Sequence, residues 1–118
     1  RVVVGGMDRR DAAGAAHAVA ECGAYVALDH VGSADPAYLD DAERADLAAA
    51  LVAAGHLDRV LVSSNAIGVA KGQPDDERPS EAIITAFAPL LAERGVAEAD
   101  IRRILTANPA ALLAVKEA

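Results

Sequence analysis

The apolar run Val60–Val62 is the feature that most constrains how this chain can fold. It stands between Asp58-Arg59 and Ser63-Ser64, a pattern typical of a short strand buried on both faces of a parallel sheet. Two similar runs precede it, at residues 2–4 and 25–28. Neighbouring parallel strands cannot be joined by a tight turn, so the segments between these runs must contain crossover connections, usually helices.

The intervening segments have the composition of helices. We expect helices at residues 8–22, 36–54 and 80–94, ended by Gly23, Gly55 and Gly95, and a last short helix at 110–116. Asp35 and Pro36 are suited to open the second helix. In that helix, Leu39, Leu47, Leu51 and Ala54 are expected on the buried face, and the charged residues Asp40, Asp41, Glu43, Arg44 and Asp46 mostly outward.

Two further features interrupt the helical pattern. Pro89 lies inside the apolar stripe of the third helix and predicts a kink or break there. Residues 68–80, rich in Gly, Pro and acidic residues, form a loop that is long for an internal connection, as in lids, binding loops or disordered segments.

The order of elements is strand, helix, strand, helix, strand, helix, and it predicts an α/β fold in one domain, 1–118, with right-handed crossovers. One strand in about 30 residues suits a TIM (β/α)₈ barrel of about 250 residues, of which the sequence would hold three units. The alternative is a small three-stranded sheet standing alone. Because Arg1 leads directly into the first strand, we expect the chain to begin inside a larger unit.

Composition excludes several classes of protein. The formal net charge of −7, without a cluster of Lys and Arg, argues against a nucleic-acid partner. Cys22 is the only cysteine, so no internal disulfide can form and a reducing cytoplasmic location is expected. The sequence has no apolar stretch of the length that a membrane-spanning helix needs.

Polar residues follow each predicted strand, where α/β folds bind their ligands. They are Gly6 with Asp8, Asp29 with His30, and Asn65. The Asp29-His30 pair could serve as an acid/base pair or a metal site, or simply cap a loop with a hydrogen-bonded histidine. Asn65 is a poor candidate for chemistry, because an amide is no general base and a weak metal ligand. His17 and His56 are interpreted as surface or packing residues.

Taken together, four stretches resemble the C-terminal part of the phosphotriesterase family. They are residues 1–8, residues 23–30, residues 58–65 and Ala107-Asn108-Pro109-Ala110. This resemblance implies strands 6–8 and their helices from a TIM barrel of the amidohydrolase type. It also implies a hydrolase that uses zinc or another divalent metal to cleave a small phosphotriester, lactone or related ester.

At two positions of the implied metal site, the sequence differs from the family pattern. Gly6 stands where the family has a metal-binding His, and Asn65 stands where the family has the Asp that binds metal and activates water. His30 matches a His that helps to carry the proton away, Asp29 precedes it, and Asp8 would lie in the second shell of the site. The other family ligands would lie on strands that this chain does not contain.

Two functional hypotheses follow. The first is a part of a phosphotriesterase-family hydrolase, incomplete or impaired because Gly6 and Asn65 replace ligands that hold the metals. The second is a non-catalytic binding or assembly module derived from the barrel. In either case the exposed sheet edges lead us to expect self-association, or association with the missing barrel strands.

Overall fold

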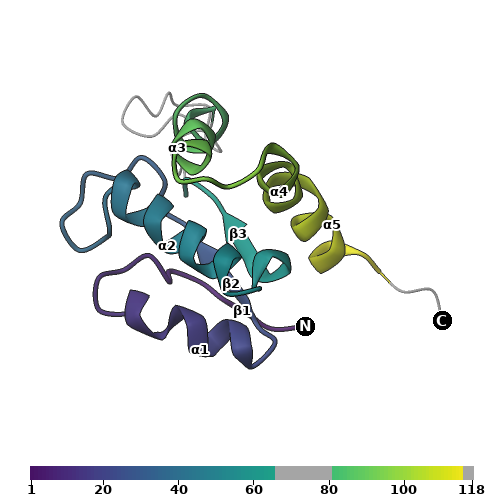
Figure 1. Ribbon diagram of the computed structural model, residues 1–118. Coiled ribbons are helices and arrows are strands. Elements are labelled where there is room, and N and C mark those ends of the chain that lie inside the picture. Colours follow the sequence, from purple (N-terminus) through teal and green to yellow (C-terminus); the bar gives the residue numbers. More distant parts are fainter. Residues whose placement is uncertain (66–80, 116–118) are drawn as a thin grey trace, which may run out of the picture.

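Three parallel strands form the centre of the computed structural model, which describes residues 1–65 and 81–115. Strands β1 (Val3–Val4), β2 (Tyr25–Leu28) and β3 (Val60–Val62) lie side by side in the order β1-β2-β3 (Figure 1). The register aligns Val4 with Val26 and Val26 with Val60. The predicted α/β fold and the position of all three strands are confirmed.

The two faces of the sheet differ in burial. Val26 and Val60, which share one face, are completely buried in the core. On the opposite face Tyr25 and Ala27 of the central strand are buried, but at the two edge strands Val3 is 42% exposed and Leu61 is only partly buried. The expectation that Val60–Val62 is buried on both faces is therefore wrong for Leu61, because β3 is an edge strand of the described sheet and that face is less covered there.

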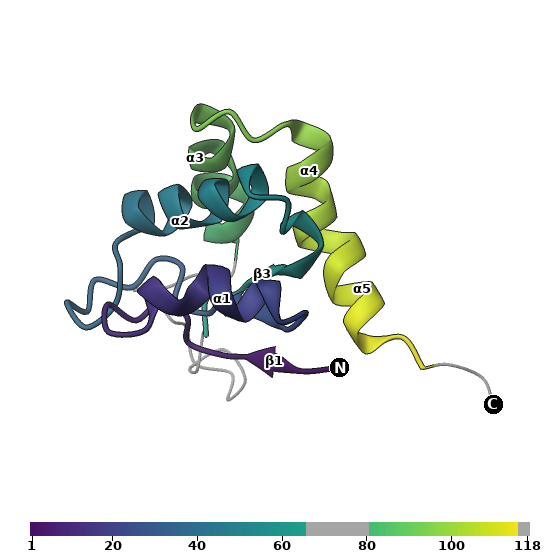
Figure 2. The ribbon, with the colours of Figure 1, turned by 60° about the horizontal axis from the view of Figure 1, so that its bottom comes forward.

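Several helices pack around the covered face (Figures 1 and 2). They are α1 (Ala16–Glu21), α2 (Asp41–Ala53), α3 (Ala88–Glu93), α4 (Glu98–Arg102) and α5 (Asn108–Leu113), with short 3₁₀ turns at Ala13–Ala15 and Leu57–Arg59. Their inward residues join the strands in one core that includes Ala48, Leu51, Phe87, Leu91 and Ile104. The alanines Ala16 and Ala20 of α1 and Ala45 and Ala48 of α2 are buried in this core.

The first two predicted helices begin later than expected. The predicted helix at 8–22 starts only with the 3₁₀ turn at Ala13, because hydrogen bonds hold Asp8 at the end of β1 and Arg9 forms a bridge with Tyr38. The predicted helix at 36–54 starts at Asp41. The segment before it is a turn in which Asp35 accepts hydrogen bonds from Ala37 and Tyr38, so Pro36 does not open the helix.

The C-terminal helices contain two π-helical turns. Residues Ile83–Phe87 are π-helical, and the helix becomes α-helical at Ala88, next to Pro89. A disruption was expected there because proline lacks the backbone N–H of a regular helix. A second π turn, Arg103–Ala107, joins α4 to α5, and α5 begins at Asn108 rather than at 110. The predicted loop 68–80 lies outside the described residues.

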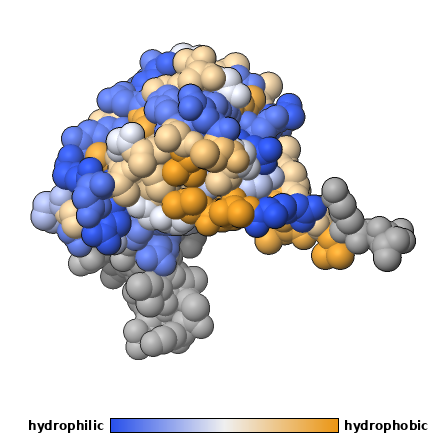
Figure 3. Space-filling model, turned by 90° about the horizontal axis from the view of Figure 1, so that it is seen from below, coloured by the Kyte–Doolittle hydropathy of each residue, from blue (hydrophilic) through white to orange (hydrophobic). Residues whose placement is uncertain are grey.

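A groove of about 640 Å³ opens beside the less covered face of the sheet. Its walls include Val3, Ala27 and Leu61 from the strands and Ile84 and Leu112 from the helical segments. Orange, hydrophobic surface also runs across the middle of the face shown in Figure 3. No helix among the described residues is long and apolar enough to cross a membrane.

Candidate functional site

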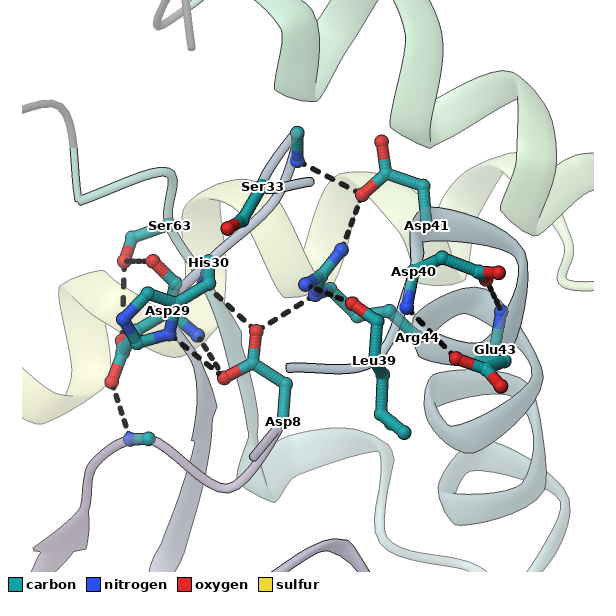
Figure 4. Close-up of polar contacts among 12 residues, drawn as sticks. Asp8, Asp29, His30, Ser33, Leu39, Asp40, Asp41, Glu43, Arg44 and Ser63 are labelled. Carbon is teal, nitrogen blue, oxygen red and sulfur yellow. Dashed lines mark hydrogen bonds and ion pairs between the residues drawn. The ribbon is translucent and has the colours of Figure 1, made fainter. Parts of the chain in front are cut away.

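The carboxyl ends of the three strands meet at one edge of the sheet, and Asp29 connects them. Its Oδ2 accepts a hydrogen bond of 2.7 Å from the backbone N–H of Gly6, after β1. Its Oδ1 accepts one of 3.1 Å from the hydroxyl of Ser63, after β3. Asp29 therefore ties all three strand ends together, and both of its oxygens are engaged in doing so (Figure 4).

Asp8, whose side chain is fully buried, forms a second network beside the first. Its carboxylate accepts hydrogen bonds from the backbone N–H of His30 (2.8 Å) and more weakly from that of Asp29 (3.3 Å). Nδ1 of His30 lies 3.1 Å from Asp8 Oδ1, and Nε of Arg44 lies 2.7 Å from Oδ2. Asp8 and Arg44 are both fully buried, so this is an ion pair shielded from water (Figure 4).

These contacts favour the ionised form of Asp8. Burial by itself raises the pKa of a carboxyl group, but the hydrogen bonds from His30 and Arg44 more than offset it, so the pKa of Asp8 lies below its ordinary value of 3.8. Asp8 is thus a carboxylate that only accepts hydrogen bonds.

Arg44 reaches this network from the first turn of α2. Its other nitrogens donate to the carboxylate of Asp41 and, at 2.6 Å, to the carbonyl of Leu39. The expectation that Arg44 points outward is wrong. Ala48 and Leu51 follow Arg44 at i+4 and i+7 and are also fully buried. The helical period through these two residues therefore also indicates that Arg44 lies on the buried face of α2.

His30 is fixed from two sides. Nδ1 contacts Asp8, and the ring stacks on Tyr38 with centroids 3.7 Å apart and planes 20° apart. Its side chain is 12% exposed. The sequence suggested Asp29-His30 as a pair, but the two neighbours have different partners: Asp29 bonds to Gly6 and Ser63, and the carboxylate that contacts the His30 ring is Asp8.

Gly6 and Asn65 stand at the ends of β1 and β3. Gly6 has φ 64° and Asn65 has φ 51°, both in the left-handed region, which Gly and Asn tolerate best. Asn65 is exposed, and no hydrogen bond in the described part of the chain joins it to Gly6, Asp8, Asp29 or His30. The structure brings those four together and leaves Asn65 at the rim.

The residues at these strand ends do not fit a metal ion on their own. Gly6 has no donor side chain, Asp29 is committed to Gly6 and Ser63, and Asp8 is neutralised by Arg44. Across residues 1–65 and 81–115, no group of three or more His, Cys, Asp or Glu side chains is placed to hold a metal. His17 and His56 only face each other edge to face, with ring centroids 6.1 Å apart.

Comparison with known proteins identifies a family match along most of the chain. The model of the phosphotriesterase family matches residues 1–113. A search of curated proteins gave no match.

Solved structures of similar proteins extend along most of the chain. A mutant of a PTE-like lactonase from Deinococcus radiodurans is 25% identical, with a TM-score of 0.80 over 97% of this chain and 39% of its own. The phosphotriesterase homology protein of Escherichia coli, solved with phosphate in its active site, is 29% identical, with a TM-score of 0.73 over 94% of this chain and 38% of its own. A resiniferatoxin-binding protein from Rhodobacter sphaeroides is 24% identical, with a TM-score of 0.62 over 79% and 28%. The chain thus spans well under half the length of these proteins.

Proposed function

Because this chain belongs to the phosphotriesterase family, we propose that it supplies the last three βα units of a TIM-barrel hydrolase that cleaves an ester bond of a small molecule. The supporting observation is the gathering of Gly6, Asp8, Asp29 and His30 at the carboxyl ends of parallel strands. This is the edge at which TIM barrels carry out their chemistry.

The proposed substrate is a lactone or a related phosphate or carboxylic ester. One similar structure is a PTE-like lactonase, and another holds phosphate in its active site. The groove beside the strands offers mainly apolar walls, with Asp29, Ser63 and Thr106 as the polar residues that line it. Such a site suits a small ligand with an apolar body and an ester head. The proposed location is a reducing cytoplasm, in which the single, exposed Cys22 would stay a free thiol.

Zinc or another divalent metal is the cofactor that the family implies, and the described residues do not form a site for it. We therefore assign no step to a metal held by this chain. His30 can accept or pass a proton at the ring nitrogen that does not face Asp8. Asp29 and Ser63 orient the strand ends, and metal ligands would come from other strands of a complete barrel.

A chimera tests the proposal. The first five βα units of the Deinococcus lactonase would be joined to this chain, and hydrolysis of lactones and phosphotriesters would be measured with added zinc. A second chimera would carry Gly6→His and Asn65→Asp. We expect the substituted chimera to bind zinc and to hydrolyse a lactone about 10–100-fold faster than the unsubstituted one, because it restores two ligand positions.

Two other outcomes would have different consequences, and only the second would count against the proposal. If the unsubstituted chimera were equally active, the site would use ligands other than positions 6 and 65. If both chimeras folded and bound metal without any hydrolysis, the second candidate, a non-catalytic binding or assembly module, would be favoured. That candidate is supported by Gly6, by Asn65 and by the exposed valines Val2 and Val3.

A further inference from the structure

The strongest feature that the proposed reaction leaves unexplained is the completely buried guanidinium of Arg44. A buried cation is costly unless it is paired and fully hydrogen-bonded. Arg44 meets this condition through Asp8, Asp41 and the carbonyl of Leu39. None of the buried side-chain nitrogen and oxygen atoms within the described ranges lacks a partner. The geometry around Arg44 is therefore specific, and one of its acceptors, Asp8, also contacts His30.

The contact between Asp8 and His30 determines where the histidine carries its hydrogen. An ionised carboxylate can only accept a hydrogen bond, so Nδ1 of His30, 3.1 Å from Asp8 Oδ1, must be the protonated nitrogen. In a neutral imidazole the other nitrogen, Nε2, then carries the lone pair. The stacked ring of Tyr38 prevents the imidazole from turning over freely.

The charge on Asp8 could be balanced by either of two neighbours, Arg44 or a doubly protonated His30. Arg44 is already a permanent cation at 2.7 Å from Oδ2, so His30 need not take a second proton. The other titratable groups around His30 are Asp29 beside it in sequence, Tyr38 stacked on it, and Asp41, which pairs with Arg44 on its far side.

We propose that Arg44 is a positioning residue, which neutralises Asp8 and thereby keeps His30 as a neutral imidazole with a hydrogen on Nδ1 and a lone pair on Nε2. This inference rests on the proposed function in one respect only: a lone pair on Nε2 is what His30 needs to accept a proton at the strand ends. The state of the ring itself does not depend on catalysis, so it can be measured without a substrate.

The test is ¹⁵N NMR of the histidine rings in the full chain at neutral pH. In the unmodified chain we expect His30 to show a protonated Nδ1 and an unprotonated Nε2. In Arg44→Met, His30 becomes the remaining group able to neutralise Asp8, and the signal of an unprotonated Nε2 should be lost. Arg44→Lys should retain most of it, because a cation near Asp8 is restored.

Arg10→Met is the matched control, because Arg10 also bonds to a carboxylate of α2, Glu43, but does not contact Asp8. Its spectrum for His30 should equal that of the unmodified chain. An unprotonated Nε2 that persists in folded Arg44→Met overturns the proposal. If Arg44→Met does not fold, the unmodified chain and Arg44→Lys decide: two protonated ring nitrogens in the former, or loss of the Nε2 signal in the latter, overturn it. Failure of hydrolysis in the chimera would leave these spectra unaffected.

Discussion

At the scale of single residues, the buried pair of Asp8 and Arg44 links the ends of β1 and β2 to the first turn of α2. Such pairs stabilise a fold less than their number of bonds suggests, because both charges lose their hydration. Their importance lies in the cost of losing one member. A substitution of either Asp8 or Arg44 should therefore change the free energy of unfolding by a large, measurable amount.

We expect Arg44→Met to lower the free energy of unfolding by about 3 kcal/mol, the lower end of the range for breaking a buried pair, because protonation of His30 replaces only part of the lost charge pairing. Arg10→Met, which removes an exposed pair with Glu43, should change it by at most about 1 kcal/mol. Urea unfolding followed by circular dichroism measures both. Equal effects of the two substitutions would contradict the buried pair.

The lowered pKa of Asp8 also predicts how stability depends on pH. A carboxyl group whose pKa is lower in the folded state contributes stability above its unfolded pKa and loses it as pH falls through its folded pKa. Stability should therefore decline as pH falls below about 3.8, the ordinary value for Asp8. In Asp8→Asn this part of the decline should be absent. Urea midpoints measured between neutral and acidic pH would show it, and parallel curves would refute it.

At the scale of elements, α2 is the helix whose start is most clearly encoded. The side chain of Asp40 accepts a hydrogen bond of 2.8 Å from the N–H of Glu43, and the carboxylate of Glu43 accepts one of 2.9 Å from the N–H of Asp40. This reciprocal capping box, and not Pro36, sets the beginning of the helix. It also holds Arg44, one residue further on, in the position from which it reaches Asp8.

Asp40→Ala should therefore cost about 1 kcal/mol of stability, since it removes the cap of α2. Asp46→Ala is a suitable comparison, because Asp46 lies on the same helix and forms only an exposed pair with Arg94. It should cost at most about 0.5 kcal/mol. Thermal unfolding of the two variants distinguishes the values, and an Asp40→Ala variant as stable as the unmodified chain would show that the cap is dispensable.

At the scale of the whole molecule, the described chain has an incompletely covered sheet. β1 and β3 each have one neighbouring strand among the described residues, and Val2 and Val3 are 62% and 42% exposed. A parallel sheet with open edges and exposed valines is completed by further strands or associates with other chains. The relatives, whose chains are more than twice as long, are consistent with further strands.

We predict that the 118-residue chain alone associates with itself through the edges that carry β1 and β3. Sedimentation equilibrium at micromolar concentrations should give a mass well above 12.0 kDa. Val3→Lys should weaken association at least about tenfold, because a charge at the edge opposes strand pairing. Ala50→Lys, on the exposed side of α2, should leave it unchanged. A stable monomer with cooperative unfolding would remove the basis of this prediction.

Much of the fold was determined by the sequence on its own. The apolar runs at Tyr25–Leu28 and Val60–Val62 are strands at the predicted positions, because short Val-rich runs between polar residues have few other ways to be buried. Gly23, Gly55 and Gly95 all have positive φ at the ends of helical segments, as their positions predicted. The candidates Gly6, Asp8, Asp29 and His30 also lie together, since they follow neighbouring parallel strands.

Which of these groups contact one another depends on the three-dimensional packing of the elements. Asp29 and His30 are adjacent in sequence, yet one bonds across to Ser63 and the other to Asp8, because successive residues at a strand end point to opposite faces of the sheet. Arg44 is charged, as surface residues usually are, yet it lies in the core. Asp41 and Leu39, just before it in sequence, and Asp8, far from it in sequence, supply its hydrogen-bond acceptors. The helical period can place Arg44 on the buried face, but its pairing with Asp8 depends on how α2 packs across the ends of β1 and β2.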